Sequence, residues 1–91
     1  MAVNVLIPTQ LHGLTHGQDT VHLEAVCVAE LLTGLEANYP GMGNRVNDEG
    51  GNLRRFINLF VNGEDIRFLQ LADTPLKDGD EVSIVPAITG G

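Results

Sequence analysis

The sequence predicts an α+β roll, in which a mixed sheet carries one main helix on one face. Two observations lead to this fold class. The apolar pattern runs strand, strand, helix, strand, short strand, strand, so two hairpin-like units flank a single helix. The chain has 91 residues, of which 43% are hydrophobic, and this is enough for one domain with one modest core. The first and last strands are expected to pair in parallel at the centre of the sheet.

The amino-terminal pattern predicts the first hairpin. Residues 3–7 alternate between apolar and other side chains, and Pro8 ends the strand. Residues 20–24 are predicted as the second strand, and the stretch 9–19 between them as a turn region.

A change to helical period marks residues 25–38. The apolar residues at spacings of three and four form one stripe of a helix: Val28, Leu31, Leu32 and Leu35. The start is poorly marked, because no Ser, Thr, Asp or Asn stands just before the periodic run. Asn38 and Pro40 mark the end.

The second half of the chain is predicted to begin with a long loop over residues 40–53, of the kind that is often functional or mobile. The alternating stretch 55–62 predicts a strand with Ile57, Leu59 and Val61 facing inward. Asn62-Gly63 predicts a tight turn into a short arm over residues 64–69.

The chain closes with a turn cluster at 74–80 and a last strand at 81–86, with Val82 and Ile84 inward. Residues 1–86 are therefore predicted to form the folded domain, and residues 87–91 a flexible C-terminal Gly-Gly tail.

Composition excludes several classes of function. Twelve acidic residues against five basic ones give a net charge of −7, which argues against nucleic-acid binding and favours basic protein partners. No apolar run approaches the roughly 20 residues of a membrane span. The first residues show no basic signal-peptide region, and Cys27 is the one cysteine, so a reducing cytoplasm is the expected compartment.

The two terminal glycines are the candidate reactive site. Gly90 and Gly91 lack Cβ atoms, so this end can lie extended in a narrow slot of another protein's active site, and the Gly91 carboxylate is unhindered. The alternative is a frayed chain end without a role. The internal pair Gly50-Gly51 has no free carboxylate and cannot do the same chemistry.

The solvent side of the sheet offers a candidate docking surface. Polar Asn4, Asn58, Glu81 and Ser83 identify that side, and period-two counting places three apolar residues on it: Leu6, Phe60 and Val85. Together with Ile88 and Thr89 of the tail, these are the partner-docking candidates. The alternative is that a loop covers them or that they are merely scattered.

Other candidate sites are weaker. The histidines and the cysteine match no zinc-ligand spacing, so no metal site is expected: His12, His16, His22 and Cys27. No glycine-rich stretch has the sequence of a phosphate-binding loop, and no set of nucleophile, base and orienting residue stands out. The chain is expected to be a carrier or a substrate of other enzymes, without catalytic residues of its own.

The carboxyl-terminal segment 76–91 resembles the end of the ubiquitin-like sulfur carrier proteins of the MoaD/ThiS family, in which a DGDEV turn and strand lead into a Pro-containing tail ending in Gly-Gly. Residues 61–65, Val-Asn-Gly-Glu-Asp, resemble the family's VNxxD turn. Residues 35–41 and 55–58 are most similar to the CysO-type branch of actinobacterial carriers. The sequence departs at Val26-Cys27, where the family often has Asp-Thr, and this puts only the helix cap in question.

The resemblance implies a β-grasp (ubiquitin-like) fold and a cycle of sulfur transfer. An E1-like activating enzyme, using ATP and magnesium, would adenylate the Gly91 carboxylate, and a sulfur donor would convert it to a thiocarboxylate. The partners implied are this enzyme and a sulfur-accepting enzyme, either a PLP-dependent cysteine synthase or a thiolating synthase, with a metalloprotease that processes the C-terminus as a further partner. The protein itself is expected to hold no cofactor.

Three alternatives stay open from the sequence. The protein could be the small subunit of a molybdopterin synthase, although the loop 40–53 and the chain length favour the CysO-type branch slightly. It could be a modifier joined to lysines of target proteins, as ubiquitin is. It could also be a binding module whose sheet face is its whole function.

Overall fold

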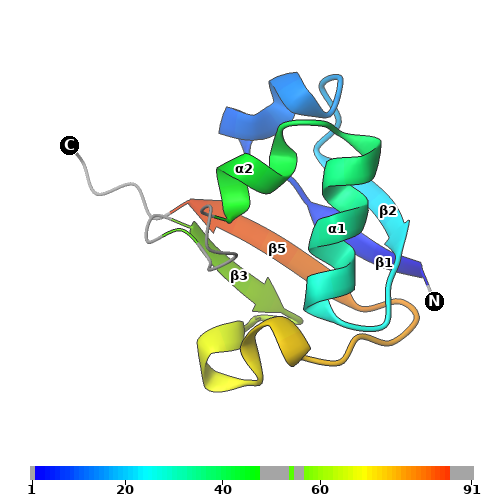
Figure 1. The fold of residues 1–91 in the computed structure, drawn as a ribbon, viewed down its shortest axis with the longest axis vertical. Coiled ribbons are helices and arrows are strands. Elements are labelled where there is room, and N and C mark those ends of the chain that lie inside the picture. Colours follow the sequence, from blue (N-terminus) through cyan, green and yellow to red (C-terminus); the bar gives the residue numbers. More distant parts are fainter. Residues whose placement is uncertain (1, 48–53, 55–56, 87–91) are drawn as a thin grey trace.

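The computed structural model describes residues 2–47, 54 and 57–86. Within this part of the chain, five strands form one mixed sheet in the order β2-β1-β5-β3-β4 (Figure 1). The strands are β1 (Ala2–Leu6), β2 (Thr20–Glu24), β3 (Ile57–Val61), β4 (Glu64–Asp65) and β5 (Glu81–Pro86). Strands β1 and β5 pair in parallel, and the other pairs are antiparallel. The predicted roll, its first hairpin and its parallel central pair are confirmed.

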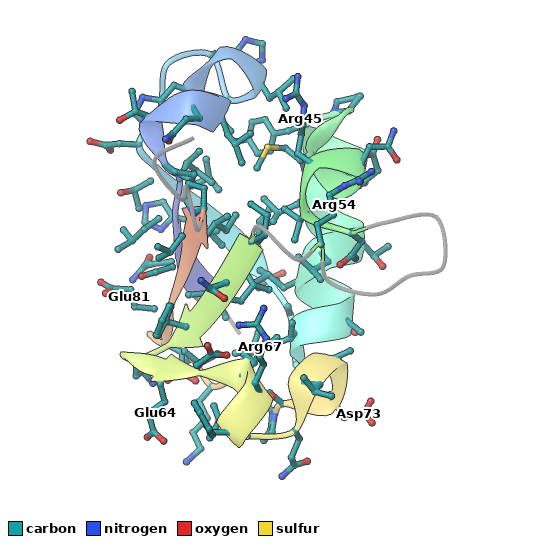
Figure 2. The ribbon with its side chains drawn as sticks, turned by 90° about the vertical axis from the view of Figure 1, so that its left-hand side faces the viewer. Arg45, Arg54, Glu64, Arg67, Asp73 and Glu81 are labelled. Carbon is teal, nitrogen blue, oxygen red and sulfur yellow. The ribbon has the colours of Figure 1, made fainter. Side chains whose placement is uncertain are left out.

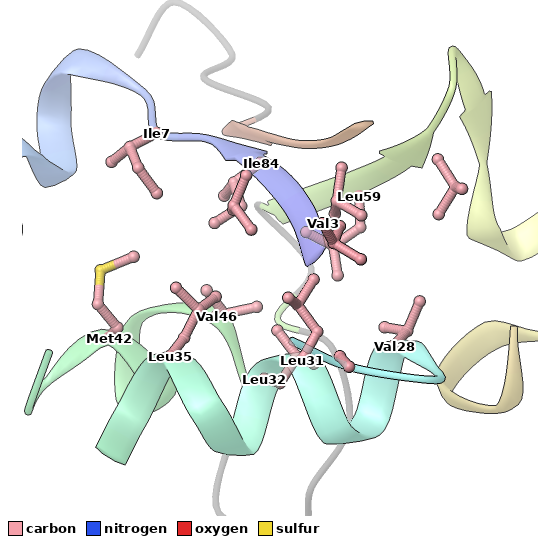
Figure 3. Packing of buried hydrophobic residues seen from close by; sticks show 14 of the residues in the cluster. Val3, Ile7, Val28, Leu31, Leu32, Leu35, Met42, Val46, Leu59 and Ile84 are labelled. Carbon is pink, nitrogen blue, oxygen red and sulfur yellow. The ribbon is translucent and has the colours of Figure 1, made fainter. Parts of the chain in front are cut away.

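The helix α1 (Val28–Asn38) covers one face of this sheet, and α2 (Met42–Val46) lies beside it (Figure 1). All four residues of the predicted stripe are buried. In Figure 3 they point toward inner-face residues of the strands, such as Val3, Leu59 and Ile84. Since the inner residues of β3 and β5 are also buried, the predicted inward faces of both strands are confirmed.

The start of α1 lies later than predicted, at Val28 with Cys27 as the N-cap residue. The Cys27 side chain makes no capping hydrogen bond. Instead, the backbone N–H of Val28 donates to the carbonyl of Thr74 at 3.1 Å, and Leu76 N–H donates to the carbonyl of Val26 at 3.0 Å. A distant segment therefore satisfies the N–H of the first helical residue, and this contact helps to set where α1 begins.

The prediction of an unbroken loop over residues 40–53 is wrong in its first part, because this range contains α2. Met42 and Val46 are each 0% exposed and join the core. Their spacing of four residues is that of one helix face, but a single pair is too short a signal among the surrounding Gly and Asn residues.

The Glu36 side chain holds the start of α2 in place. Its carboxylate accepts hydrogen bonds from the N–H of Gly41 at 3.1 Å and from the N–H of Gly43 at 2.8 Å. A Cβ atom at position 43 would lie 2.8 Å from Glu36 Oε1, so a larger residue there would displace the carboxylate that accepts from the N–H groups of Gly41 and Gly43.

Short helical turns occur in the predicted turn region 9–19 and in and after the predicted arm 64–69. The 3-10 helix η1 (Thr9–Leu14) lies between β1 and β2. The predicted arm over residues 64–69 is a strand only at Glu64 and Asp65, and the 3-10 helices η2 (Ile66–Phe68) and η3 (Leu71–Asp73) follow it. Asp65 ends the strand because its side chain accepts a hydrogen bond from the N–H of Arg67 at 2.8 Å, which caps η2.

No helix in the described part of the chain is both long enough and apolar enough to span a bilayer.

Candidate functional site

Strand β5 is the element that leads to the predicted reactive tail, and it is held on both sides. It pairs with β1 from Asn4↔Glu81 to Leu6↔Ser83, and with β3 up to Ile57↔Pro86. Pro86 is the last described residue of β5, and it has no N–H to donate to the sheet. The central position of β5 therefore fixes the point at which residues 87–91 begin.

The tail residues themselves are outside the described part of the chain. This applies to Ile88, Thr89, Gly90 and Gly91, and to the proposed boundary between residues 1–86 and 87–91. Their predicted roles stay predictions.

The outer face of the sheet, which points away from α1, brings together the three apolar docking candidates. Leu6 of β1 pairs with Ser83 of β5. Phe60 of β3 pairs with the same Ser83 from the other side of β5. Val85 lies two residues further along β5, opposite Asn58. We call Leu6, Phe60 and Val85 the outer-face patch. Val85 is 40% exposed, whereas Leu6 and Phe60 are half-buried. The residues share one face as counted from the sequence, and their role in docking stays a prediction.

Arg67 borders the outer-face patch on the β3 side, and sequence reasoning missed it. Its guanidinium donates to Asn58 Oδ1 and, at 3.3 Å, to the backbone carbonyl of Ile57, and it lies 3.3 Å from the Asp65 carboxylate. Figure 2 places Arg67 between β3 and the turn that carries η2. Because β4 pairs only with Phe60 and Val61, the arginine covers the part of the β3 edge that β4 leaves open.

The start of β5 is held by a clip that joins two sequence motifs. Asn62 Nδ2 donates to Asp80 Oδ1 at 3.0 Å, and Asn62 Oδ1 accepts from the N–H of Glu81 at 3.0 Å. Asp80 also accepts from the N–H of Lys77 at 2.8 Å. The Asn62-Gly63 turn and the Asp78-Gly79-Asp80 turn, far apart in sequence, therefore meet at the same end of the sheet.

The same contacts set the electrostatics of Asp80. The hydrogen bond from Asn62 lowers the pKa of the Asp80 carboxyl below its ordinary value of 3.8, and the Lys77 N–H and the Lys77 charge act in the same direction. The carboxylate is thereby kept ionised as the anchor of the clip. Asp-Gly and Asn-Gly pairs signal turns in the sequence, but nothing in the sequence says that the two turns contact each other.

The histidines His12 and His22 contact different residues of the chain. His12 Nε2 lies 2.9 Å from the carbonyl oxygen of Ile7, and His22 Nδ1 contacts Asn4 Oδ1. Cys27 stands before α1. In the described ranges, no three His, Cys, Asp or Glu side chains are arranged to hold a metal ion.

A mixed five-stranded sheet with β5 in the centre and one main helix on its inner face defines a β-grasp, ubiquitin-like protein, as the resemblance implied. The solved structures agree. A chain of the BexX/CysO complex of Amycolatopsis orientalis superposes with a TM-score of 0.92 at 39% identity, covering 98% of this chain and 99% of that one. The small archaeal modifier protein 1 of Methanosarcina acetivorans superposes with a TM-score of 0.86 at 30% identity, covering 99% and 96%.

The family follows from the sequence comparisons. The ThiS family model matches residues 5–91, and the chain belongs to this family. It is 43% identical to the sulfur carrier protein CysO of Mycobacterium tuberculosis over 93 aligned positions, covering 100% of both chains. The predicted family and its CysO-type branch are confirmed by these matches.

Proposed function

We propose that this protein carries sulfur as a thiocarboxylate at the carboxyl group of Gly91. The observation that carries the proposal is the full-length likeness to the sulfur carrier CysO, together with a family match that runs through the two terminal glycines. The protein acts as a carrier on which other enzymes work, without catalytic residues of its own.

The chemistry needs two steps at Gly91. In the first, a carboxylate oxygen attacks the α-phosphorus of ATP on an activating enzyme and pyrophosphate leaves, which makes an acyl adenylate. In the second, sulfide sulfur from a donor attacks the acyl carbon, and AMP leaves with the bonding electron pair. The product is a thiocarboxylate, which is a better nucleophile than the carboxylate it replaces.

The described part of the chain supports this by fixing the base of the tail. Residues 87–91 follow Pro86 directly, and five extended residues span at most about 17 Å. The activating enzyme must therefore approach close to the end of β5, where the outer-face patch lies on one side of the sheet. We propose that Leu6, Phe60 and Val85, with Ile88 and Thr89 of the tail, form the surface that enzyme contacts.

The sulfur acceptor is proposed from the CysO likeness. It is an enzyme of cysteine synthesis or of a thiolated metabolite. The similar Amycolatopsis orientalis chain belongs to a complex of CysO with BexX, which supports a carrier that works through a protein partner. After transfer, the Gly91 carboxylate is regenerated for a further round, or a protease restores it by trimming the product from the C-terminus.

The decisive experiment is the intact mass of the protein after incubation with an E1-like activating enzyme, ATP, magnesium and a sulfide source. We expect a gain of about 16 Da, because sulfur replaces oxygen, and fragmentation should localise it to Gly91. A deletion of Gly90-Gly91 is the matched control and should show no gain. An unchanged mass, with an enzyme that is active on another carrier, would overturn the proposal.

A second candidate function has support from one comparison. The likeness to small archaeal modifier protein 1 favours conjugation of Gly91 to lysines of other proteins. Mass spectrometry of cell extracts would distinguish the two functions, because a modifier leaves its terminal glycines attached to target lysines and a carrier does not.

A further inference from the structure

A second surface, separate from β5 and the outer-face patch, lies on the helical side of the molecule. It is a groove of about 880 Å³ between α1 and the turns η2 and η3. Leu32 and Ala37 line it from α1, Gly43 from α2, and Leu71 and Asp73 from η3. Its volume is within the range of binding sites, roughly 300–1,000 Å³.

The wall of the groove exposes apolar side chains. Leu71, which lines the groove, is 54% exposed, and Leu32 and Ile66 line it as well. Phe68 and Leu69, outside the lining, are 85% and 37% exposed in the same segment. Exposed apolar surface of this kind is typical of an interaction site.

The backbone holds Leu71 in this exposed position against its own preference. Leu71 has φ of 52°, in the left-handed region that a leucine rarely adopts. Buried Thr74 fixes the turn, because its Oγ1 accepts from the N–H of Gln70 at 3.0 Å and its N–H donates to the carbonyl of Leu71 at 3.1 Å. Strain that the surrounding structure maintains in this way often occurs where a surface has a function.

The charge of the groove indicates what it binds. Two acidic residues line it, Glu36 and Asp73, and none of the described basic residues does: Arg45, Arg54, Arg67 and Lys77. The Asp73 carboxylate, which projects from η3 in Figure 2, makes no hydrogen bond or ion pair with the described residues. A second copy of this chain would bring its own charge of −7, so an acidic groove favours a basic partner over self-association.

We propose that this groove binds an apolar segment of a partner protein that is flanked by Lys or Arg side chains. The apolar residues would contact Leu71 and the exposed side of α1, and the basic residues would pair with Asp73. The proposal goes beyond sulfur carriage. Because the groove is on the helical side of the sheet, its partner can bind while the outer-face patch and the tail are engaged elsewhere.

The test uses the full-length protein labelled with ¹⁵N and a short amphipathic helical peptide made of leucine and lysine. We expect saturable shifts of the amide signals of Leu32, Thr33 and Leu71. A peptide in which glutamate replaces lysine is the matched probe and should cause no shifts. Shifts centred on the acidic turn at Asp78 and Asp80, or on the outer face, would mean general charge attraction and would overturn the proposal.

Two helix variants sharpen the test. Ala37→Arg places a cation inside the groove and should weaken the peptide about ten-fold or more. Asn38→Arg adds the same charge one position along, outside the groove lining, and should weaken binding clearly less than Ala37→Arg does, because its side chain does not fill the groove. Equal weakening in both variants would overturn the site.

The apolar contact has its own test. Leu71→Ser, at an exposed side chain, should also weaken binding, and unchanged binding would contradict the apolar contact.

The result is independent of the proposed sulfur carriage, because the peptide titration needs no activating enzyme. If the protein gains no thiocarboxylate but the peptide binds as expected, only the carrier function fails. If loading is normal and the peptide does not bind, only the groove proposal fails.

Discussion

The two faces of β5 differ in burial although their residues alternate along one strand. Val82 and Ile84 on the inner face are 0% and 3% exposed, whereas Val85 on the outer face is 40% exposed and Ser83 is half-buried. The inner residues contact the core under α1, and the outer residues face a surface with no described element over it. Substitutions one to three residues apart should therefore separate an effect on stability from an effect on the proposed docking.

The largest effect is expected from the matched pair Val82→Ala and Val85→Ala. The inner substitution removes two buried methyl groups and should lower the free energy of unfolding by about 2–3 kcal/mol. The outer one should change it by no more than about 0.5 kcal/mol. Urea denaturation of both variants measures the difference. Equal losses would mean that the outer face is as tightly packed as the inner one.

A smaller loss is expected for Arg67→Met, which keeps much of the side-chain length but removes the hydrogen bonds to Asn58 and Ile57. Because the arginine is partly exposed, we expect a loss of about 1 kcal/mol in the free energy of unfolding. Hydrogen exchange should also be faster at the β3 edge. Arg45→Met, at an exposed arginine, is the control, and the same loss there would remove the special role of Arg67.

The outer-face patch is tested by Val85→Ser, with the fold retained. If the activating enzyme docks on this face, its KM for the carrier should rise about three- to ten-fold, with little change in kcat, because a hydrophobic contact is lost. Val26→Ser is the control, at a valine that is 57% exposed and lies outside the sheet. An unchanged KM for Val85→Ser would place docking elsewhere.

The smallest effect concerns pH and the clip at the start of β5. The folded state lowers the pKa of Asp80 below 3.8, so the stabilisation is present above the unfolded value and is lost as the pH falls through the folded value. Compared with Asp80→Asn, the wild type should therefore lose stability on acidification below about pH 4. Urea midpoints measured over a pH series would show this. Parallel curves for the two proteins would contradict it.

Sequence patterns predicted the sheet well because its strands alternate and its helix shows a clear period. The described residues of β1, β2, β3 and β5 follow that pattern, as does the buried stripe of α1. The start of α1 was not predictable, because Thr74 from a distant segment accepts its first hydrogen bond. The helix α2 was missed for a similar reason, since Glu36 caps it through a contact made only in the folded chain.

The candidate site was predicted only in part. Period-two counting placed Leu6, Phe60 and Val85 on one face. It succeeded because side chains alternate between the two faces along each strand, so the buried face identifies the outer one. Arg67 and the Asn62–Asp80 clip were missed, because they depend on which strands are neighbours and on the length of β4. The groove was missed as well, since its walls come from α1, α2 and η3, which no local pattern brings together.

The central position of β5 has a consequence for how the protein is made. This strand is synthesised after the other four, yet it lies between β1 and β3, and contacts such as Ala2 N–H to Asp78 Oδ1 join residues 76 positions apart. While the ribosome has not yet delivered Glu81–Pro86, the facing edges of β1 and β3 have no partner and can pair with other chains. Products truncated before β5 should therefore aggregate or be degraded, and translation must pass residue 86 before a folded domain exists.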